Sequence, residues 1–248
     1  MLYTFLKKTL VSPASKILFR QKVEGLENLP EGGAIIASNH LAFLDSIFLP
    51  LAVPREVNFL AKSDYFTGPG IKGKINKWFF EAVGQIPMDR SGGARSAASL
   101  QVGIDRLQDG AYLGIYPEGT RSPDGRLYKA KLGVARLALK ARVPVVPVGQ
   151  IGNDKVQRSG SNKLNLRDEK GQKIEIRTVI GQPLDFSEYW DRAGENAVQR
   201  LVADKIIRAI QELTQQEYVP VYAATVKTLM AKEGISADAA VEKLQKRS

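Results

Sequence analysis

Cysteine is absent from this 248-residue chain, and histidine occurs once, at His40. Without cysteine there can be no disulfide bond, no thiolate metal ligand and no cysteine nucleophile. A single histidine also excludes the usual zinc sites, which draw on several imidazoles or thiolates. If an imidazole takes part in catalysis here, His40 must supply it.

Long apolar runs are missing as well. The best candidate, residues 47–53, is broken by Pro50 and falls far short of the ~18 residues that a membrane-spanning helix needs. The N-terminus does not have the pattern of a signal peptide, because Lys7 and Lys8 interrupt the place where its apolar stretch should run. We therefore expect a protein of the cytoplasm.

Acidic residues are outnumbered, with 26 Asp and Glu against 36 Lys and Arg, so the net charge is +10. A basic surface favours anionic partners, namely nucleic acid, anionic lipid headgroups or phosphorylated substrates, and charge alone does not choose among them. Apolar residues make up 44% of the chain, which is enough for a sizeable core.

The first 20 residues carry four basic side chains and no acidic one. Apolar residues recur there at helical spacing, on the face opposite Lys7 and Lys8. Ser12 and Pro13 predict a second short helix, with Ser12 as its N-cap and Pro13 at its first position. The segment fits a basic amphipathic anchor in the lipid interface, the interpretation we favour, or a helical hairpin packed on its own domain. The apolar face consists of Leu2, Phe5, Leu6 and Leu10.

Short apolar strands alternate with amphipathic helices along most of the chain. This order predicts an α/β fold, a single domain with a central, mostly parallel or mixed sheet flanked by helices. We place an amphipathic segment at 1–21, the α/β domain at 22–215 and a helical extension at 216–248. The extension can pack on the core, pair with another protein or stay loosely ordered. Strands are expected at 33–38, 57–61, 85–88, 112–116, 143–148 and 173–180, and helices at 71–83, 96–107, 132–140 and 197–213.

His40 directly follows a buried strand, and Asp45 stands five residues later. Five residues of ideal helix would turn the two side chains about 140° apart. The pair can therefore meet only if His40 lies at the turn and Asp45 in the first turns of a helix, which Ser38 or Asn39 can cap. Asp45 would then fix the tautomer of His40 and leave the other ring nitrogen as a base. Alone the motif is a weak signal, because a lone histidine is more often structural.

A second motif, residues 116–122, follows another apolar strand with the sequence Tyr-Pro-Glu-Gly-Thr-Arg-Ser. Gly119 permits a turn with positive φ, and Arg121 can bind a phosphate through two parallel hydrogen bonds. Thr120 can donate a further bond. Glu118 cannot bind phosphate, so its suitable roles are to hold an arginine or to accept from a substrate hydroxyl. The alternative is a polar turn with a local Glu–Arg pair.

Two further motifs complete the pattern. Asp89-Arg90 follows the strand at 85–88, where a surface salt bridge alone would account for it, and the Val-Pro run at 143–148 is mainly a core strand. In this order and spacing, the four motifs resemble those of the glycerolipid acyltransferase family over roughly residues 22–185. The blocks at His40–Asp45 and at 117–122 are specific in combination. Tyr116, where the family often has Phe, and Pro87-Met88 depart from its pattern.

The resemblance implies direct acyl transfer from a thioester, acyl-CoA or acyl-carrier protein, to a lysophosphatidate-like alcohol, without metal or other cofactor. It makes 22–215 the acyltransferase domain and His40 and Asp45 its catalytic pair. It also implies a binding site for the phosphate-bearing acceptor, shaped by Arg90, Glu118, Gly119, Thr120, Arg121 and Lys131, with Lys62 as a further candidate.

Competing interpretations are weaker. Residues 68–73 spell a dinucleotide fingerprint, but no strand runs into Gly68. Nucleic-acid binding explains the charge but not an arginine after each of two strands, so we expect no nucleic acid.

With this resemblance, we expect a peripheral enzyme on the cytoplasmic face of the cell membrane that acylates 1-acyl-glycerol 3-phosphate to phosphatidic acid. The alternatives are another acceptor, such as glycerol 3-phosphate or a glycolipid, and a non-catalytic lipid-surface binding protein. The sequence does not specify the preferred acyl-chain length, the choice between acyl-CoA and acyl-carrier protein, the oligomeric state, the donor to the oxyanion or the role of residues 216–248.

Overall fold

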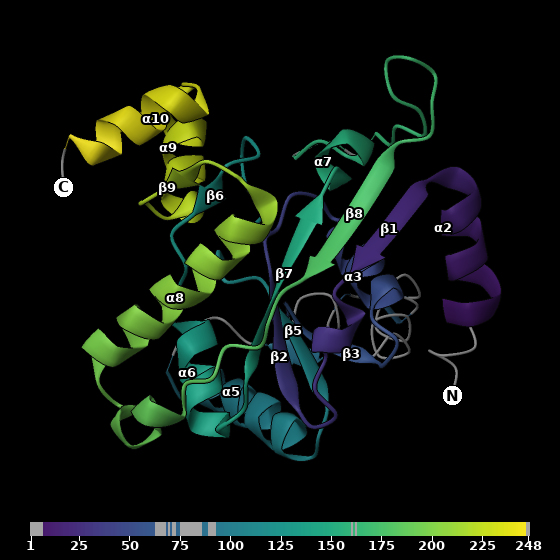
Figure 1. Cartoon of the computed structure of the whole chain (residues 1–248). Helices are drawn as coiled ribbons and strands as arrows, with labels where there is room; N and C mark the ends of the chain where they lie inside the picture. The colour runs from purple at the N-terminus through teal and green to yellow at the C-terminus, as the bar shows by residue number, and fades with distance from the viewer. Residues whose placement is uncertain are drawn as a thin grey trace.

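A seven-stranded sheet forms the centre of the molecule (Figure 1). Its strand order is β1-β8-β7-β2-β5-β3-β4, and every neighbouring pair is parallel except β7 and β8. The predicted mixed, mostly parallel sheet is therefore confirmed. The strands are β1 (Arg20–Glu24), β2 (Ala34–Ser38), β3 (Val57–Lys62), β4 (Ile86–Met88), β5 (Tyr112–Ile115), β7 (Val145–Ile151) and β8 (Glu175–Ile180). This computed structural model describes residues 7–62, 68, 70, 73–74, 86–88, 93–159, 161 and 163–246.

Helices cover both faces of this sheet (Figure 1). In β2, Ile35 and Ala37 face the core that lies under α5, α6 and α8, whereas Ala34 and Ile36 face the core shared with α3. Because both faces are buried, β2 is apolar along its whole length instead of alternating with polar residues. The helices are α2 (Ser12–Leu18), α3 (Asp45–Ala52), α5 (Gly93–Gln108), α6 (Gly133–Ala141), α7 (Asn153–Val156) and α8 (Asn196–Thr214).

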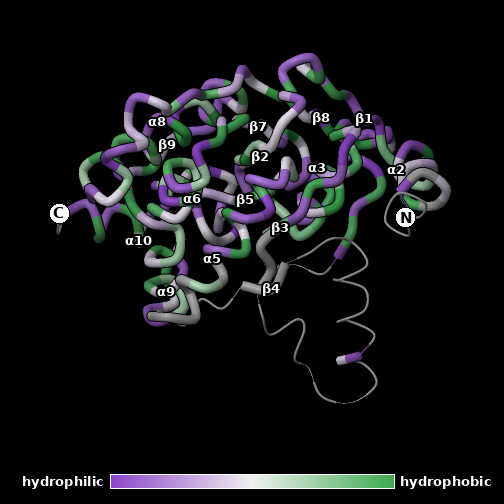
Figure 2. The backbone as a smooth tube through the Cα atoms, turned by 90° about the horizontal axis from the view of Figure 1, so that it is seen from below, coloured by the Kyte–Doolittle hydropathy of each residue, from purple (hydrophilic) through white to green (hydrophobic). Residues whose placement is uncertain are grey.

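α8 shows how the sequence directs this packing. Its apolar residues recur every three or four positions and face the core, so hydrophilic and hydrophobic segments alternate along the helix in Figure 2. The described residues also form a π-turn at Lys7–Val11 and 3-10 turns at Leu26–Asn28 and Ser187–Arg192. The buried residues of α8 are Val198, Gln199, Val202, Ala203, Ile206, Ile207 and Ile210.

The C-terminal segment packs against the α/β domain, which the sequence had left undecided. The two-residue strand β9 (Tyr218–Val219) pairs in parallel with β6 (Leu127–Tyr128). α9 (Ala223–Glu233) and α10 (Ala237–Gln245) follow, and they share a small core with Tyr128. α2 and α10 lie at opposite ends of the molecule in both ribbon views (Figures 1 and 2).

Several predicted boundaries need correction. The helix after β2 begins at Asp45, not at Ser38 or Asn39, because residues 41–44 form a turn first. Ser12 is the first helical residue rather than an N-cap, and no side-chain cap bond forms there. β1 was not predicted, because four of its five side chains are exposed and it lacks an apolar pattern.

Part of the N-terminal prediction and the helix expected at 71–83 fall largely outside the described residues. Within the residues that are described, no helix is long and apolar enough to cross a bilayer.

Candidate active site

The carboxyl ends of three neighbouring parallel strands meet at one edge of the sheet. β2 lies between β5 and β7, and their ends carry residues 39–45, 116–122 and 150–153, respectively. Ligands of open α/β sheets bind at this edge. Topology thus brings together the two motifs that the sequence singled out, and adds a third segment from β7.

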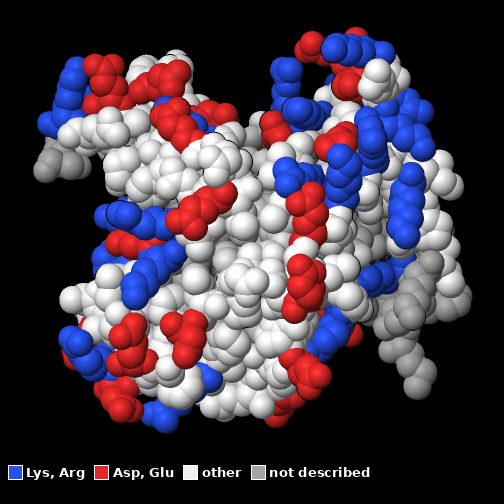
Figure 3. Space-filling view, viewed as in Figure 1, with Lys and Arg blue, Asp and Glu red and all other residues white. Residues whose placement is uncertain are grey.

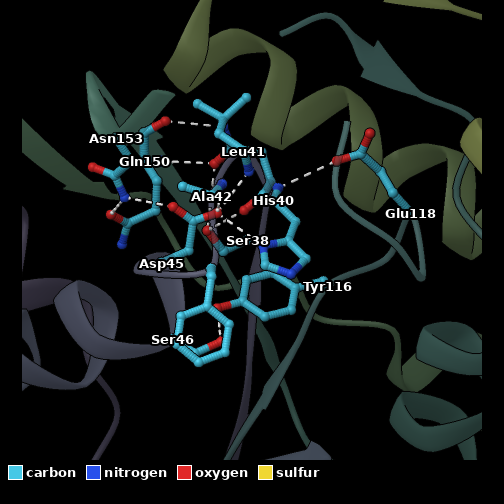
Figure 4. A network of polar contacts seen from close by, with 12 residues as sticks. Ser38, His40, Leu41, Ala42, Asp45, Ser46, Tyr116, Glu118, Gln150 and Asn153 are labelled. Atoms are coloured by element: carbon cyan, nitrogen blue, oxygen red, sulfur yellow. Dashed lines mark hydrogen bonds and ion pairs between the residues drawn. The ribbon is translucent and has the colours of Figure 1, made fainter. Parts of the chain in front are cut away.

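His40 and Asp45 form the centre of this cluster (Figure 4). His40 Nδ1 lies 2.8 Å from Asp45 Oδ2, and the backbone amides of Leu41 and Ala42 donate to the same oxygen at 2.6 and 2.8 Å. Asp45 is fully buried, whereas the His40 side chain keeps 15% of its surface exposed. An ionised carboxylate can only accept, so the proton between the two residues belongs on Nδ1 and the lone pair on Nε2. This is the arrangement of a general base with its orienting acid.

A side chain that sequence reasoning missed holds the other oxygen of Asp45. Asn153 Nδ2 donates to Asp45 Oδ1 at 2.7 Å and to Gln150 Oε1 at 2.8 Å. Both amide residues are fully buried. The only signal in the sequence is a polar residue, Asn153, two positions after the end of the strand β7. Its bond orients the carboxylate that in turn orients His40.

Tyr116 supports the imidazole from its flat side. The rings of His40 and Tyr116 stack with centroids 3.8 Å apart and planes 8° from parallel (Figure 4). The Tyr116 hydroxyl is 3.0 Å from Ser46 Oγ, and Phe59 stacks on Tyr116 at 5.3 Å. The bond to Asp45 and this stacking together fix the position and the plane of the ring.

The structure gives Glu118 two backbone contacts that the sequence did not predict. The residue is 1% exposed, and its carboxylate accepts from the backbone amides of His40 at 3.3 Å and of Tyr128 at 2.9 Å. Burial raises the pKa of Glu118 to about 8. The side chain therefore joins the backbone of His40 to the backbone of β6 at Tyr128. Among the described residues it holds no arginine. Direct contact with substrate is not supported by this geometry.

The loop after Glu118 presents polar and cationic groups at the same edge. Gly119 has φ +73°, the left-handed conformation expected for it, and a Cβ there would lie 2.9 Å from Lys131 Cδ. Thr120 and Arg121 are partly exposed and Lys131 is exposed. The Ser122 amide donates to the His40 carbonyl at 2.7 Å, which ties the loop to the turn that carries the base. Four of the six predicted acceptor-site residues thus lie in or against one loop.

The remaining predicted residues are not placed. Arg90 lies outside the described residues, and so does the side chain of Lys62. Within the described part of the chain, no three His, Asp or Glu side chains come together in the manner of a metal site.

Comparison with known proteins finds a family and several relatives for this chain. A family model described as Acyltransferase matches residues 20–150. A chloroplast 1-acyl-sn-glycerol-3-phosphate acyltransferase of Arabidopsis thaliana is 34% identical over 186 residues, which cover 74% of this chain and 49% of that protein. A protein of Bacillus subtilis with the same enzyme name is 29% identical over 173 residues, 68% of this chain and 75% of that one.

The fold has a counterpart among solved structures. The crystal structure of the 1-acyl-sn-glycerophosphate (LPA) acyltransferase PlsC from Thermotoga maritima matches with a TM-score of 0.63 and 24% identity, over 85% of this chain and 79% of that one. The chain spans about half the length of the plant relatives.

Proposed function

Because this chain belongs to the acyltransferase family, we propose that it transfers a fatty acyl group from a thioester to the free hydroxyl of 1-acyl-glycerol 3-phosphate, giving phosphatidic acid. The donor is acyl-CoA or acyl-carrier protein, and no metal or other cofactor takes part. The observation that carries the proposal is the 2.8 Å contact between His40 Nδ1 and Asp45 Oδ2 beside the loop of Thr120 and Arg121. The enzyme names of the relatives support the same acceptor.

The geometry supports direct transfer in two steps. Nε2 of His40 takes the proton of the acceptor hydroxyl as that oxygen attacks the thioester carbonyl carbon. The tetrahedral adduct then expels the sulfur, and the imidazolium returns the proton to the departing thiolate. Asp45 stabilises the imidazolium between the two steps. Within the described residues Nε2 has no hydrogen-bond partner, so it is available to the acceptor.

The acceptor's phosphate would be held by the loop cations. Arg121 offers a planar pair of donors that suits a phosphate, and Lys131 adds a mobile charge over Gly119. Thr120 can donate from the same loop, and Arg90 remains a family-based candidate. Holding the phosphate places the hydroxyl against His40, and such positioning accounts for much of the rate gain in bimolecular reactions.

We further propose that the enzyme works as a peripheral protein on an anionic membrane surface, at the cytoplasmic face of the cell membrane. Ile17 is 68% exposed and Leu18 38%, although both belong to an apolar stretch of α2. Exposed Lys and Arg side chains gather on the side of the molecule that carries α2, β1 and the loop after α7 (Figure 3). Apolar contact and attraction to anionic headgroups together bind such segments to membranes.

Thiol release from a long-chain acyl donor tests the reaction. Acyl-CoA and acyl-carrier protein are each supplied with 1-acyl-glycerol 3-phosphate, and wild type is compared with His40→Ala. We expect release that requires acceptor and falls by ~10²–10⁴ in the variant. Substantial activity in His40→Ala would refute the mechanism, since the chain has no other histidine. Glycerol 3-phosphate and a glycolipid are run in parallel, and a higher kcat/KM with either would replace the proposed acceptor.

A further inference from the structure

The C-terminal segment is bonded to the loop that carries Thr120 and Arg121. β9 pairs with β6, and the Leu127 amide donates to the Glu217 carbonyl at 2.9 Å. The Lys129 amide donates to the Val221 carbonyl at 3.1 Å. The segment therefore has a defined position relative to the site.

One side chain of this segment, Gln216, contacts the residue that precedes His40. Gln216 Oε1 accepts from Asn39 Nδ2 at 2.8 Å, and Gln216 Nε2 donates to the Gly125 carbonyl at 2.5 Å. Asn39 directly precedes His40, so Gln216 joins the turn that carries His40 to the loop that carries Thr120 and Arg121. These two bonds fix the chain before α9 to both segments of the candidate site.

α9 directs Lys227 toward the loop that carries Thr120 and Arg121. Ala223 and Val226 on this helix are fully buried, which sets the rotation of the helix. Lys227 is half-buried, and its Nζ donates to Thr120 Oγ1 at 3.4 Å. Lys232, further along α9, is exposed and has no such contact among the described residues. Lys227 is therefore not an ordinary solvated lysine of this helix.

Three cations thus lie around the loop without a salt bridge to any described residue, although the Glu118 carboxyl acts on Lys227 through its charge. Arg121, Lys131 and Lys227 make no ion pair with any described Asp or Glu. Burial and the neighbouring charge of Arg121 lower the pKa of Lys227. Like charges gathered in this way repel one another, and an anion between them would remove the repulsion.

We propose that Lys227 binds the phosphate monoester of the acceptor, together with Thr120 and Arg121, so that the C-terminal segment completes the acceptor site. The identity of the acceptor rests on the function proposed above. A phosphate monoester also occurs on CoA, at the 3′ position, and the kinetics below separate the two sources.

Kinetics of three variants test the proposal. Lys227→Met removes the charge while keeping the length of the side chain, Lys227→Arg keeps the charge, and Lys232→Met is the matched control on α9. A hydrogen bond to a charged group corresponds to about tenfold to hundredfold in affinity. We expect Lys227→Met to raise the KM for 1-acyl-glycerol 3-phosphate by that factor with kcat and the KM for acyl-CoA nearly unchanged. Lys227→Arg should retain most of the affinity, and Lys232→Met should match wild type.

Two results would overturn the assignment: an unchanged acceptor KM in Lys227→Met, or an increase confined to the KM for acyl-CoA. Calorimetric titration with glycerol 3-phosphate, without donor, provides a readout independent of turnover. Weaker binding in Lys227→Met than in wild type and Lys232→Met supports the phosphate contact even if the acylation reaction fails, whereas equal binding opposes it.

Discussion

The imidazole of His40 lies flat on the phenol ring of Tyr116, with centroids 3.8 Å apart and planes 8° from parallel. Asp45 holds the ring at its edge and Tyr116 at its face. Nε2, the proposed base, is left as the nitrogen available to an acceptor. The rotation of the ring is restricted without any contact that would occupy that nitrogen.

Loss of the Tyr116 ring should therefore lower kcat, whereas loss of its hydroxyl alone should change kcat little. Tyr116→Phe keeps the stacked face and loses only the contact with Ser46, so we expect activity within about threefold of wild type. Tyr116→Leu removes the stacking, which contributes ~0.5–1.5 kcal/mol in aromatic pairs and corresponds to a ~3- to ~10-fold lower kcat. Steady-state kinetics at saturating acceptor measure both. Equal loss in the two variants would assign the effect to the hydroxyl instead.

Asn153 is expected to act through Asp45. Asn153→Ala leaves Asp45 Oδ1 without its donor inside a buried site, and we expect kcat to fall ~10-fold or more while the acceptor KM stays nearly constant. Asn165→Ala is a suitable control, because the side-chain amide of Asn165 donates to the Lys155 carbonyl, away from Asp45. A rise in KM with unchanged kcat would place Asn153 in substrate binding.

Glu118 predicts a specific pH dependence of stability. Its pKa of about 8 in the folded protein lies above the ordinary value of 4.5, so between these pH values the folded state holds a proton that the unfolded state has lost. The contribution of this group to the free energy of unfolding must then decrease as pH rises, by at most ~1.4 kcal/mol per pH unit.

Glu118→Gln should abolish that slope. At pH 5 the variant should also be less stable by ~1–3 kcal/mol, because its NH₂ group cannot accept from a backbone amide as the hydroxyl oxygen of the protonated Glu118 still can. Urea unfolding from pH 5 to 8.5 measures the difference between variant and wild type, with Glu27→Gln, an exposed position, as control. A difference that is independent of pH would contradict the raised pKa.

Exposed apolar residues of α2 should contribute to membrane binding. Ile17→Glu is expected to weaken binding to vesicles that contain phosphatidylglycerol by about tenfold or more, because burial of an isoleucine side chain contributes ~1.5–3 kcal/mol. Co-sedimentation with vesicles measures the effect. Leu201→Glu, at a 42% exposed leucine of α8, is the control. If both substitutions weaken binding equally, α2 is not the docking segment.

Much of the site could be predicted because its central pair is local. His40 and Asp45 are joined by one turn after a buried strand, and the need for that turn follows from helix geometry alone. The mixed sheet follows equally from alternating strands and helices. Glu118 also lies at the end of a strand as expected, whereas its contacts with two backbone amides were not predicted.

The parts that could not be predicted depend on contacts between distant segments. Asn153 meets Asp45 across 108 residues of sequence, and Lys227 meets Thr120 across 107. Nothing in the local pattern of either segment specifies the other. The strands β6 and β9 have two residues each, which is too short for any periodicity. Such contacts are set by tertiary packing.

The link between Gln216 and Gly125 closes a loop of 91 residues, and it has a consequence for how the protein folds during its synthesis on the ribosome. Synthesis runs from the N-terminus, so His40, Asp45 and the loop of Thr120 emerge long before the residues that brace them. Contacts of such wide sequence separation form late, since the intervening chain must first be ordered. A nascent chain can therefore bring His40 and Asp45 together and still lack the proposed phosphate ligand Lys227 until α9 has been translated.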